Sequence, residues 1–334
     1  MQPQNHNTID DEVQEINEER TLIKAAKDQN VIFVQSILKI GADVNVQDEN
    51  GSTPLHIVSE NGNVPIADLL LRFGAKVNIQ NSKNETPIYF AVINRHFEVV
   101  EKLLANGADL NVEDEPLLHL AIDKYIGQPN LQIVKKLIDY GANIETQDQD
   151  GRSPLRLALV KKNDQIIKLL LMNGAEFSTG TFLMLSLKGD PEIVQIMIDK
   201  GANVELYGLL ACVASLGHLE VLKLLIKYGA DVNESSYHSP LHKAVDNNHK
   251  EIVYELLKNG ANANLQDRNG NTPIHMGHFS PEALKVLLKE GNNLHLEIRN
   301  HNGQTPFEFF LGGASRRNLK EVVRIMLLAK HQND

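Results

Sequence analysis

The sequence predicts an all-α solenoid, a stack of about ten similar helix–turn–helix units. Three observations support this fold class. A Gly-Ala step recurs along the chain, a Thr-Pro or Ser-Pro pair stands ahead of most of these steps, and apolar residues between the two marks keep helical spacing. A fixed period of about 20–50 residues indicates a repeat architecture. The recurrent glycines are Gly41, Gly74, Gly107, Gly141, Gly174, Gly201, Gly229 and Gly260.

Each mark has a local role in a helix pair. A Thr or Ser before Pro starts the inner helix, because its hydroxyl accepts hydrogen bonds from free amides and Pro in the first position loses none. Gly107 ends the outer helix Glu98–Ala105, since glycine readily takes the left-handed conformation. One pair cannot bury its own apolar face, so copies must stack. We expect the first pair, near Leu22, and the last helix, through Leu319–Leu328, to cap the stack.

The starts of the inner helices resemble a known family. They include Thr53-Pro54-Leu55-His56, Ser239-Pro240-Leu241-His242 and Thr272-Pro273-Ile274-His275. Together with the Gly-Ala steps, these tetrapeptides resemble ankyrin repeats over residues 20–330. The resemblance implies an inner helix, an outer helix and a projecting β-turn finger in each unit. We expect the acidic residues 1–19 to be a flexible segment and residues 331–334 to be a short tail.

The resemblance also accounts for several histidines. His56, His119, His242 and His275 share one repeat position, which the family uses for structural hydrogen bonds. His238 lies four residues before His242, but the helix starts between them and no carboxylate accompanies the pair in sequence. We therefore expect no metal site. Cys212 lies in an apolar stretch, which predicts a buried and unreactive thiol.

The sequence does not favour an enzyme. It contains no glycine-rich phosphate loop and no nucleophile-elbow or kinase signature. The residues outside the repeats are too few to fold as a catalytic domain. We therefore expect neither catalysis nor a cofactor.

Charge and composition limit the kinds of partner and the cellular location that the sequence predicts. The net charge of −10 and the lack of a basic stretch argue against a nucleic-acid partner. No apolar run approaches the roughly 18–20 residues that a membrane helix needs, and the N-terminus does not read as a secretory signal. With a single cysteine, we expect a cytoplasmic monomer. Export into a host cell without a cleaved signal is the alternative location.

Three fingers are shorter than the others, at residues 107–119, 174–183 and 201–211. The last two precede inner helices that lack Thr-Pro, so we expect those helices to lose their N-caps and be less stable. Drift within a variable repeat explains the short fingers, because loop length is thermodynamically cheap to change. The alternative is a notch in the row of fingers that is shaped for a partner, and both interpretations stay open.

The resemblance implies that a partner protein binds the concave surface. In the family, the fourth and fifth residues after the His position face the groove, and apolar residues recur there in this chain. Packing against the next repeat would bury these apolar residues instead, and that alternative also stays open. The candidate contact residues, with three from the fingers, are Ile93, Asn94, Arg152, Val160, Lys161, Leu187, Lys188, Tyr207, Leu216, Tyr237 and Asp246.

The predicted function is a protein–protein interaction scaffold or adaptor. The alternative is a targeting or effector module that acts on host proteins, or regulates an enzyme in trans, without catalysis of its own. Asn111 and Asn233 resemble asparagine-hydroxylation sites of ankyrin repeats, which implies that the protein can be a substrate of such a hydroxylase.

Overall fold

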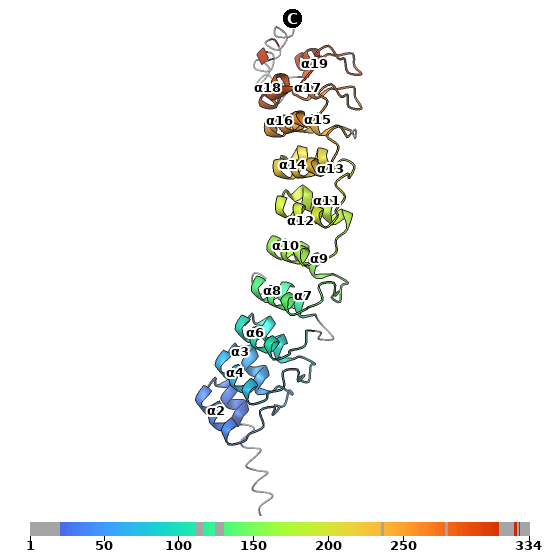
Figure 1. Ribbon diagram of the computed structural model, residues 1–334. Helices are drawn as coiled ribbons and strands as arrows, with labels where there is room; N and C mark the ends of the chain where they lie inside the picture. The colour runs from blue at the N-terminus through green and yellow to red at the C-terminus, as the bar shows by residue number, and fades with distance from the viewer. Residues whose placement is uncertain are drawn as a thin grey trace, which may run out of the picture. The chain divides into compact units, whose positions relative to one another are not determined.

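The computed structural model describes residues 21–110, 116–123, 130–234, 237–277 and 280–313, together with residues 324, 325 and 327. The regular structure within these ranges is helical, and they contain no strand. The chain divides into two compact units, Met1–Glu176 and Phe177–Asp334, each with its own stack of helix pairs (Figure 1). The all-α prediction is therefore confirmed.

The first unit opens with a helix at residues 21–27, followed by alternating outer and inner helices. Neighbouring inner helices pack on one another from α3 to α9, and neighbouring outer helices do so from α2 to α10. The inner helices are α3 (Pro54–Asn61), α5 (Pro87–Ile93), α7 (Leu117–Asp123) and α9 (Pro154–Val160). The outer helices are α2 (Val31–Lys39), α4 (Val64–Arg72), α6 (Phe97–Ala105), α8 (Leu131–Asp139) and α10 (Asp164–Met172).

The second unit repeats this arrangement, with inner helices packed on inner helices and outer on outer. Its inner helices are α11 (Thr179–Lys188), α13 (Leu209–Leu216), α15 (Pro240–Asp246), α17 (Pro273–Met276) and α19 (Pro306–Gly313). Its outer helices are α12 (Pro191–Asp199), α14 (Leu219–Lys227), α16 (Lys250–Lys258) and α18 (Pro281–Glu290). The C-terminal helix predicted over Leu319–Leu328 falls almost wholly outside the described residues.

The two layers of each pair meet in an apolar core. Along α6, for example, Val99, Val100, Leu103 and Leu104 lie on one face and are buried. Each such side chain stabilises the fold by about 2 kcal/mol relative to an exposed one. A Leu103→Ala substitution would therefore cost about 2–5 kcal/mol, because it adds a cavity to the lost burial.

Local sequence marks fix the ends of the inner helices. The Thr53 hydroxyl accepts a hydrogen bond from the His56 amide, and Pro54 occupies the first turn of α3. Glycine fixes the C-terminal end of another inner helix, α11. Gly189 has a φ of +86° there and lies against the His218 ring, so that a Cβ would collide with the imidazole. The His218 Nε2 donates to the Leu187 carbonyl at 2.9 Å, which ties one repeat to the next.

The two inner helices without Thr-Pro are nevertheless capped, so the expectation that they lose their N-caps is wrong. The Ser178 hydroxyl accepts from the Thr181 amide at 3.1 Å and caps α11. The residue before α13 is Gly208, which offers no side chain. The carboxylate of Glu234, in the following finger, supplies that cap instead.

Candidate protein-binding surface

Four inner helices are each joined to the next finger by a histidine. The Nε2 atoms of these histidines lie 2.7–3.1 Å from backbone carbonyls, at Glu85 for His56, Arg152 for His119, Asn271 for His242 and Gln304 for His275. A carbonyl can only accept, so each Nε2 must carry the proton and each Nδ1 is left as an acceptor. Burial lowers the pKa of His56 and His275, and lowers that of His242 to about 4. The predicted structural role of these residues is confirmed.

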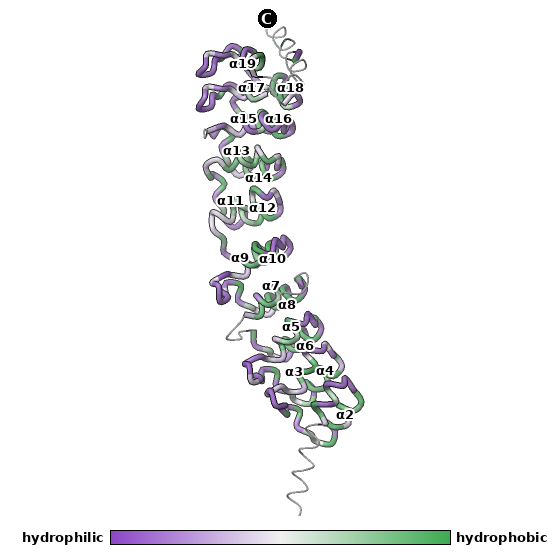
Figure 2. Tube along the Cα trace, turned by 180° about the vertical axis from the view of Figure 1, so that it is seen from behind, coloured by the Kyte–Doolittle hydropathy of each residue, from purple (hydrophilic) through white to green (hydrophobic). Residues whose placement is uncertain are grey.

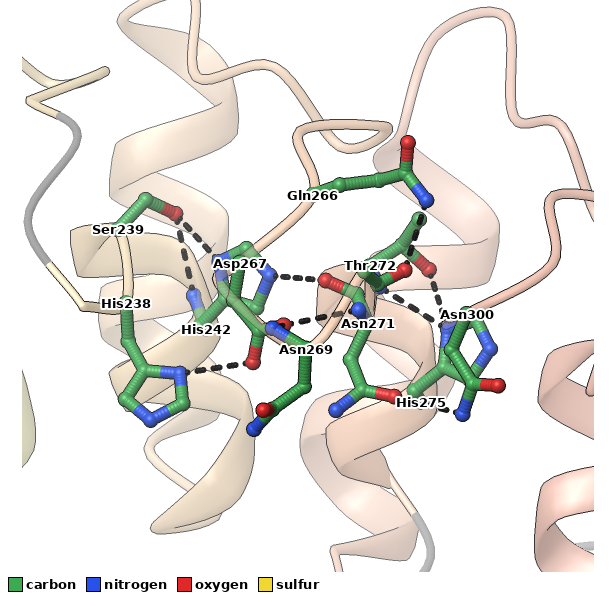
Figure 3. A network of polar contacts seen from close by, with 11 residues as sticks. His238, Ser239, His242, Gln266, Asp267, Asn269, Asn271, Thr272, His275 and Asn300 are labelled. Atoms are coloured by element: carbon green, nitrogen blue, oxygen red, sulfur yellow. Dashed lines mark hydrogen bonds and ion pairs between the residues drawn. The ribbon is translucent and has the colours of Figure 1, made fainter. Parts of the chain in front are cut away.

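One of these junctions also contains a buried carboxylate (Figure 3). The Asp267 side chain is fully buried, and its Oδ1 accepts from the amides of Asn269 and Asn271, both at 2.8 Å. Its Oδ2 lies 3.1 Å from the His238 Nδ1, a close contact without hydrogen-bond geometry. Sequence reasoning found no carboxylate beside His238 because Asp267 arrives from the next finger. The described residues contain no cluster of three or more potential metal ligands.

The inner helices α11 and α13 follow the same register as α3. Phe182, Leu185 and Ser186 are buried in α11, as are Leu210, Val213 and Ala214 at the matching positions of α13. The side chains that remain exposed or half-buried include Leu183, Met184 and Leu187 of α11 and Cys212, Ser215 and Leu216 of α13. Since α11 packs against α13, their outward faces are adjacent.

These outward faces are apolar. Leu183, Met184 and Leu216 are 38%, 50% and 52% exposed, Cys212 is exposed, and Leu187 is half-buried. We call these five residues the α11–α13 patch. In the next inner helix, α15, the positions that match Cys212 and Ser215 hold Lys243 and Asp246. In Figure 2, α13 is hydrophobic along most of its length, whereas the fingers beside α17 and α19 are strongly hydrophilic.

The exposure of Cys212 contradicts the expectation of a buried thiol. Nearly every residue of α13 is apolar, so the pattern alone cannot tell which side faces out. The repeat register carried the missing signal: Met184 and Cys212 both occupy the first position after the His position, which is outward in these two helices. Sequence reasoning considered only the fourth and fifth positions and therefore missed both residues.

The predicted polar contacts of the second unit lie at helix ends. Lys188 ends α11 and Asp246 ends α15, and both side chains are exposed. The Asp246 carbonyl accepts from the Ser280 hydroxyl at 3.0 Å, which leaves its carboxylate outside that contact.

The predicted residues of the first unit are less accessible as a group. Ile93 and Asn94 are half-buried, and the Asn94 amide donates back to the Phe90 carbonyl at 2.9 Å. Val160 is 60% exposed at the end of α9, and Lys161 beside it is exposed. Packing therefore partly buries Ile93 and Leu187, whereas Val160 and Leu216 face solvent.

Arg152 is held by carboxylates of its own finger. Its Nε lies 2.7 Å from Asp148 and its Nη2 lies 2.9 Å from Asp150, both in its own finger. Its carbonyl also accepts from His119. The guanidinium therefore helps to shape the finger, and a binding role for Arg152 stays a prediction.

Two finger tyrosines are among the most exposed large side chains of the second unit. Tyr207 is 74% exposed and Tyr237 is 64% exposed. The guanidinium carbon of Arg268, from the next finger, lies 3.5 Å from the centre of the Tyr237 ring. Sequence reasoning named both tyrosines but not Arg268, because no local pattern joins residues of successive fingers.

Comparison with known families settles the nature of the repeat. The family described as ankyrin repeats (3 copies) matches residues 22–114, 118–208, 182–267, 209–298 and 241–334. The chain belongs to the ankyrin-repeat family. Ankyrin repeats generally serve as protein–protein interaction modules.

Several curated ankyrin proteins are similar to parts of the chain. Human protein fem-1 homolog C is 38% identical over 69 residues, which cover 18% of this chain and 11% of that protein. The putative ankyrin repeat protein FPV031 of fowlpox virus is 30% identical over 118 residues, covering 31% of this chain and 35% of that protein. The chicken nuclear factor NF-kappa-B p105 subunit is 32% identical over 132 residues, which cover 39% of this chain and 11% of that protein. The matches thus span only a small part of the fem-1 and p105 proteins.

Asn233 joins successive ankyrin repeats. Its Nδ2 donates to the Gly260 carbonyl at 3.1 Å, and its Oδ1 accepts from the Asn262 amide at 2.7 Å. Asn78 makes the equivalent pair of bonds to Gly107 and Asp109. Hydroxylation of Asn233 stays a prediction, and Asn111 lies outside the described residues. Across the described part of the chain, no helix has the length and apolar character to cross a bilayer.

Proposed function

We propose that this ankyrin protein is an interaction scaffold or adaptor whose second unit binds a partner protein through the α11–α13 patch. The observation that carries the proposal is the exposure of apolar side chains on two consecutive inner helices. Exposed apolar clusters rimmed by polar residues tend to mark interaction sites. Lys188 and the α15 residue Asp246 supply polar groups near the patch.

The short fingers support the same surface. The finger before α13 runs only from Lys200 to Gly208, whereas the finger before α17 runs from Asn259 to Thr272. A shorter finger covers less of the inner helix that follows it. Tyr207, exposed on the first of these fingers, adds an aromatic side chain of the kind that often dominates binding energy.

The test compares partner capture by the full-length chain and two variants in an extract of the native cell. Leu216→Ser removes half-exposed apolar surface from the patch, and Tyr254→Ser removes a comparably exposed side chain from the outer helix α16. We expect the Tyr254→Ser chain to capture the same partner as the wild type. We expect Leu216→Ser to weaken that capture roughly tenfold, as the loss of about 1.4 kcal/mol would do.

Thermal melting of both variants provides the folding control. Because Leu216 is half-exposed, its replacement should leave the melting temperature close to that of the wild type. Equal capture by all three chains would contradict the proposal. A large drop in the melting temperature of Leu216→Ser would show instead that this side chain belongs to the core.

The proposal includes a cytoplasmic monomer as the working form. A free, exposed thiol at Cys212 supports a reducing compartment, where such thiols persist. An adaptor that acts in its own cell and an effector that acts on host proteins would use this same surface. The source of the captured partner separates those two roles.

A further inference from the structure

Tyr237 occupies a finger position that holds glycine in four other fingers and asparagine in a fifth. The matching residues are Gly51, Asn84, Gly151, Gly270 and Gly303, and all five have positive φ angles. At Gly270, a Cβ would collide with the backbone of His301 in the following finger. The amide of His301 also donates to the Asn269 carbonyl at 2.9 Å, so these two fingers touch through their backbones.

The finger of Tyr237 meets its neighbour through side chains. The Arg268 guanidinium lies over the Tyr237 ring, with 3.5 Å between its carbon and the ring centre. Asp267, the residue next to Arg268, is turned inward to His238 and does not neutralise the guanidinium. In the described part of the chain, no ion pair joins Arg268 to a carboxylate, whereas Arg152 has two such pairs and Arg299 has one.

This arrangement leaves an ordered cation at the surface. Stacking fixes the guanidinium plane, while its N–H groups at the edge remain suited to two parallel bonds with a carboxylate. Because the side chain is already ordered, binding loses less side-chain entropy. The finger of Tyr237 leads into α15, which packs against α13, and the finger of Arg268 leads into α17, which packs against α15. Tyr237 therefore lies one repeat, and Arg268 two repeats, from Leu216.

We infer that the Tyr237–Arg268 pair and the α11–α13 patch together recognise a protein segment that carries an acidic side chain next to apolar ones. This inference rests on the proposed function and adds the chemistry of the partner. The net charge of −10 does not prevent it, because charges beyond about 8 Å are largely screened at physiological salt. The guanidinium of Arg268 therefore determines the preference for an acidic side chain at this place.

The test uses a random peptide display library as the probe, selected on the full-length wild-type chain. Enriched peptides should carry Asp or Glu within a few residues of apolar side chains. For the tightest peptide, we expect Arg268→Gln to weaken binding about tenfold, the size of one charge-assisted hydrogen bond. Arg268→Lys should recover only part of this loss, because lysine keeps the charge but not the planar fork.

Replacing the acidic residue of the peptide by its amide should weaken binding by the same factor of about ten. The amide peptide and Arg268→Gln together should cost little more than either alone, which is the signature of direct coupling. Arg268 is exposed, so melting of the Arg268→Gln chain should match the wild type. Tyr254→Ser should bind the peptide like the wild type.

The outcomes separate the two proposals. If Leu216→Ser abolishes binding while Arg268→Gln and the amide peptide leave it unchanged, the carboxylate inference is wrong and the proposed function stands. If neither Leu216→Ser nor Arg268→Gln affects binding, both are wrong. Both proposals are also overturned if no peptide is enriched more strongly on the wild-type chain than on the Leu216→Ser chain.

Discussion

The Oε1 atom of Glu234 accepts a hydrogen bond from the Ala211 amide at 3.1 Å, although the two residues belong to successive repeats. Its Oε2 accepts from the Gly208 amide at 3.2 Å, so one carboxylate serves two free donors at the start of α13. Burial raises the pKa of Glu234, and the two amide donors act in the opposite direction. A side chain from the next finger thus does the work of the missing Thr-Pro.

Glu234→Ala should therefore destabilise α13 in particular. Loss of an N-cap costs about 1 kcal/mol, and we expect a decrease of that size in the free energy of unfolding. Amide hydrogen exchange should accelerate first in α13 and in the inner helix packed against it, α15. The matched control is Glu205→Ala, which removes an exposed carboxylate from the preceding finger. Equal exchange in the two variants would show that the cap contributes nothing.

Much of the repeat was predictable because its marks act locally. Thr53-Pro54 and Gly107 each determine the conformation of their own few residues, so the recurrence of these marks revealed the helix boundaries. The Glu234 cap was not predictable in this way, since its donors lie one repeat earlier in the chain. No pattern within one unit identifies a partner in the next.

Acid should destabilise the protein through its buried histidines. His242 stays neutral in the folded protein down to about pH 4, whereas the unfolded chain takes up a proton near pH 6.5. The unfolded state therefore binds more protons between these values, and the free energy of unfolding falls as the pH drops from 6.5 to 4. A fully buried group of this kind contributes on the order of 3 kcal/mol to the change.

The variant His242→Gln tests this dependence. Its amide can still donate to the Asn271 carbonyl but does not titrate, so stability at pH 7 should fall while the slope between pH 6.5 and 4 becomes shallower. His295→Gln, which replaces an exposed histidine, provides the control. A wild-type slope in the His242→Gln variant would exclude His242 as the source.

Gly189 and Gly201 provide a matched pair for the contact with His218. Their φ angles are +86° and +90°, but only at Gly189 would a Cβ meet another group, the His218 ring. Both alanine variants should lose stability from the left-handed backbone, by about 1–2 kcal/mol each. Gly189→Ala should lose a further 1–3 kcal/mol or so from overpacking, measured by urea unfolding. Equal losses would mean that the ring moves aside at no cost.

The candidate surface was predictable only in part. The repeat register identified Leu216 and Val160 as outward-facing, and both are exposed. It did not foresee that Asn94 bonds to its own helix or that two aspartates hold Arg152, because those contacts depend on side-chain geometry. Arg268 was missed for the same reason, since its stacking on Tyr237 crosses from one finger to the next.

The thiol of Cys212 should react readily in the native protein. It is exposed on α13 and is the single cysteine of the chain, so alkylation reports on this position alone. We expect stoichiometric labelling by a maleimide without denaturant, at a rate close to that of the unfolded chain. Labelling that requires urea would show that the thiol is covered.

The most direct test of the account measures alkylation of Cys212 while the captured partner is titrated onto the full-length chain. Cys212 lies in the α11–α13 patch, so the rate should fall in proportion to the bound fraction and approach zero at saturation. A chain with Cys212→Ser and Tyr254→Cys, whose thiol lies on α16, should keep its rate throughout. An unchanged Cys212 rate at saturation would contradict the claim that this patch is the binding surface.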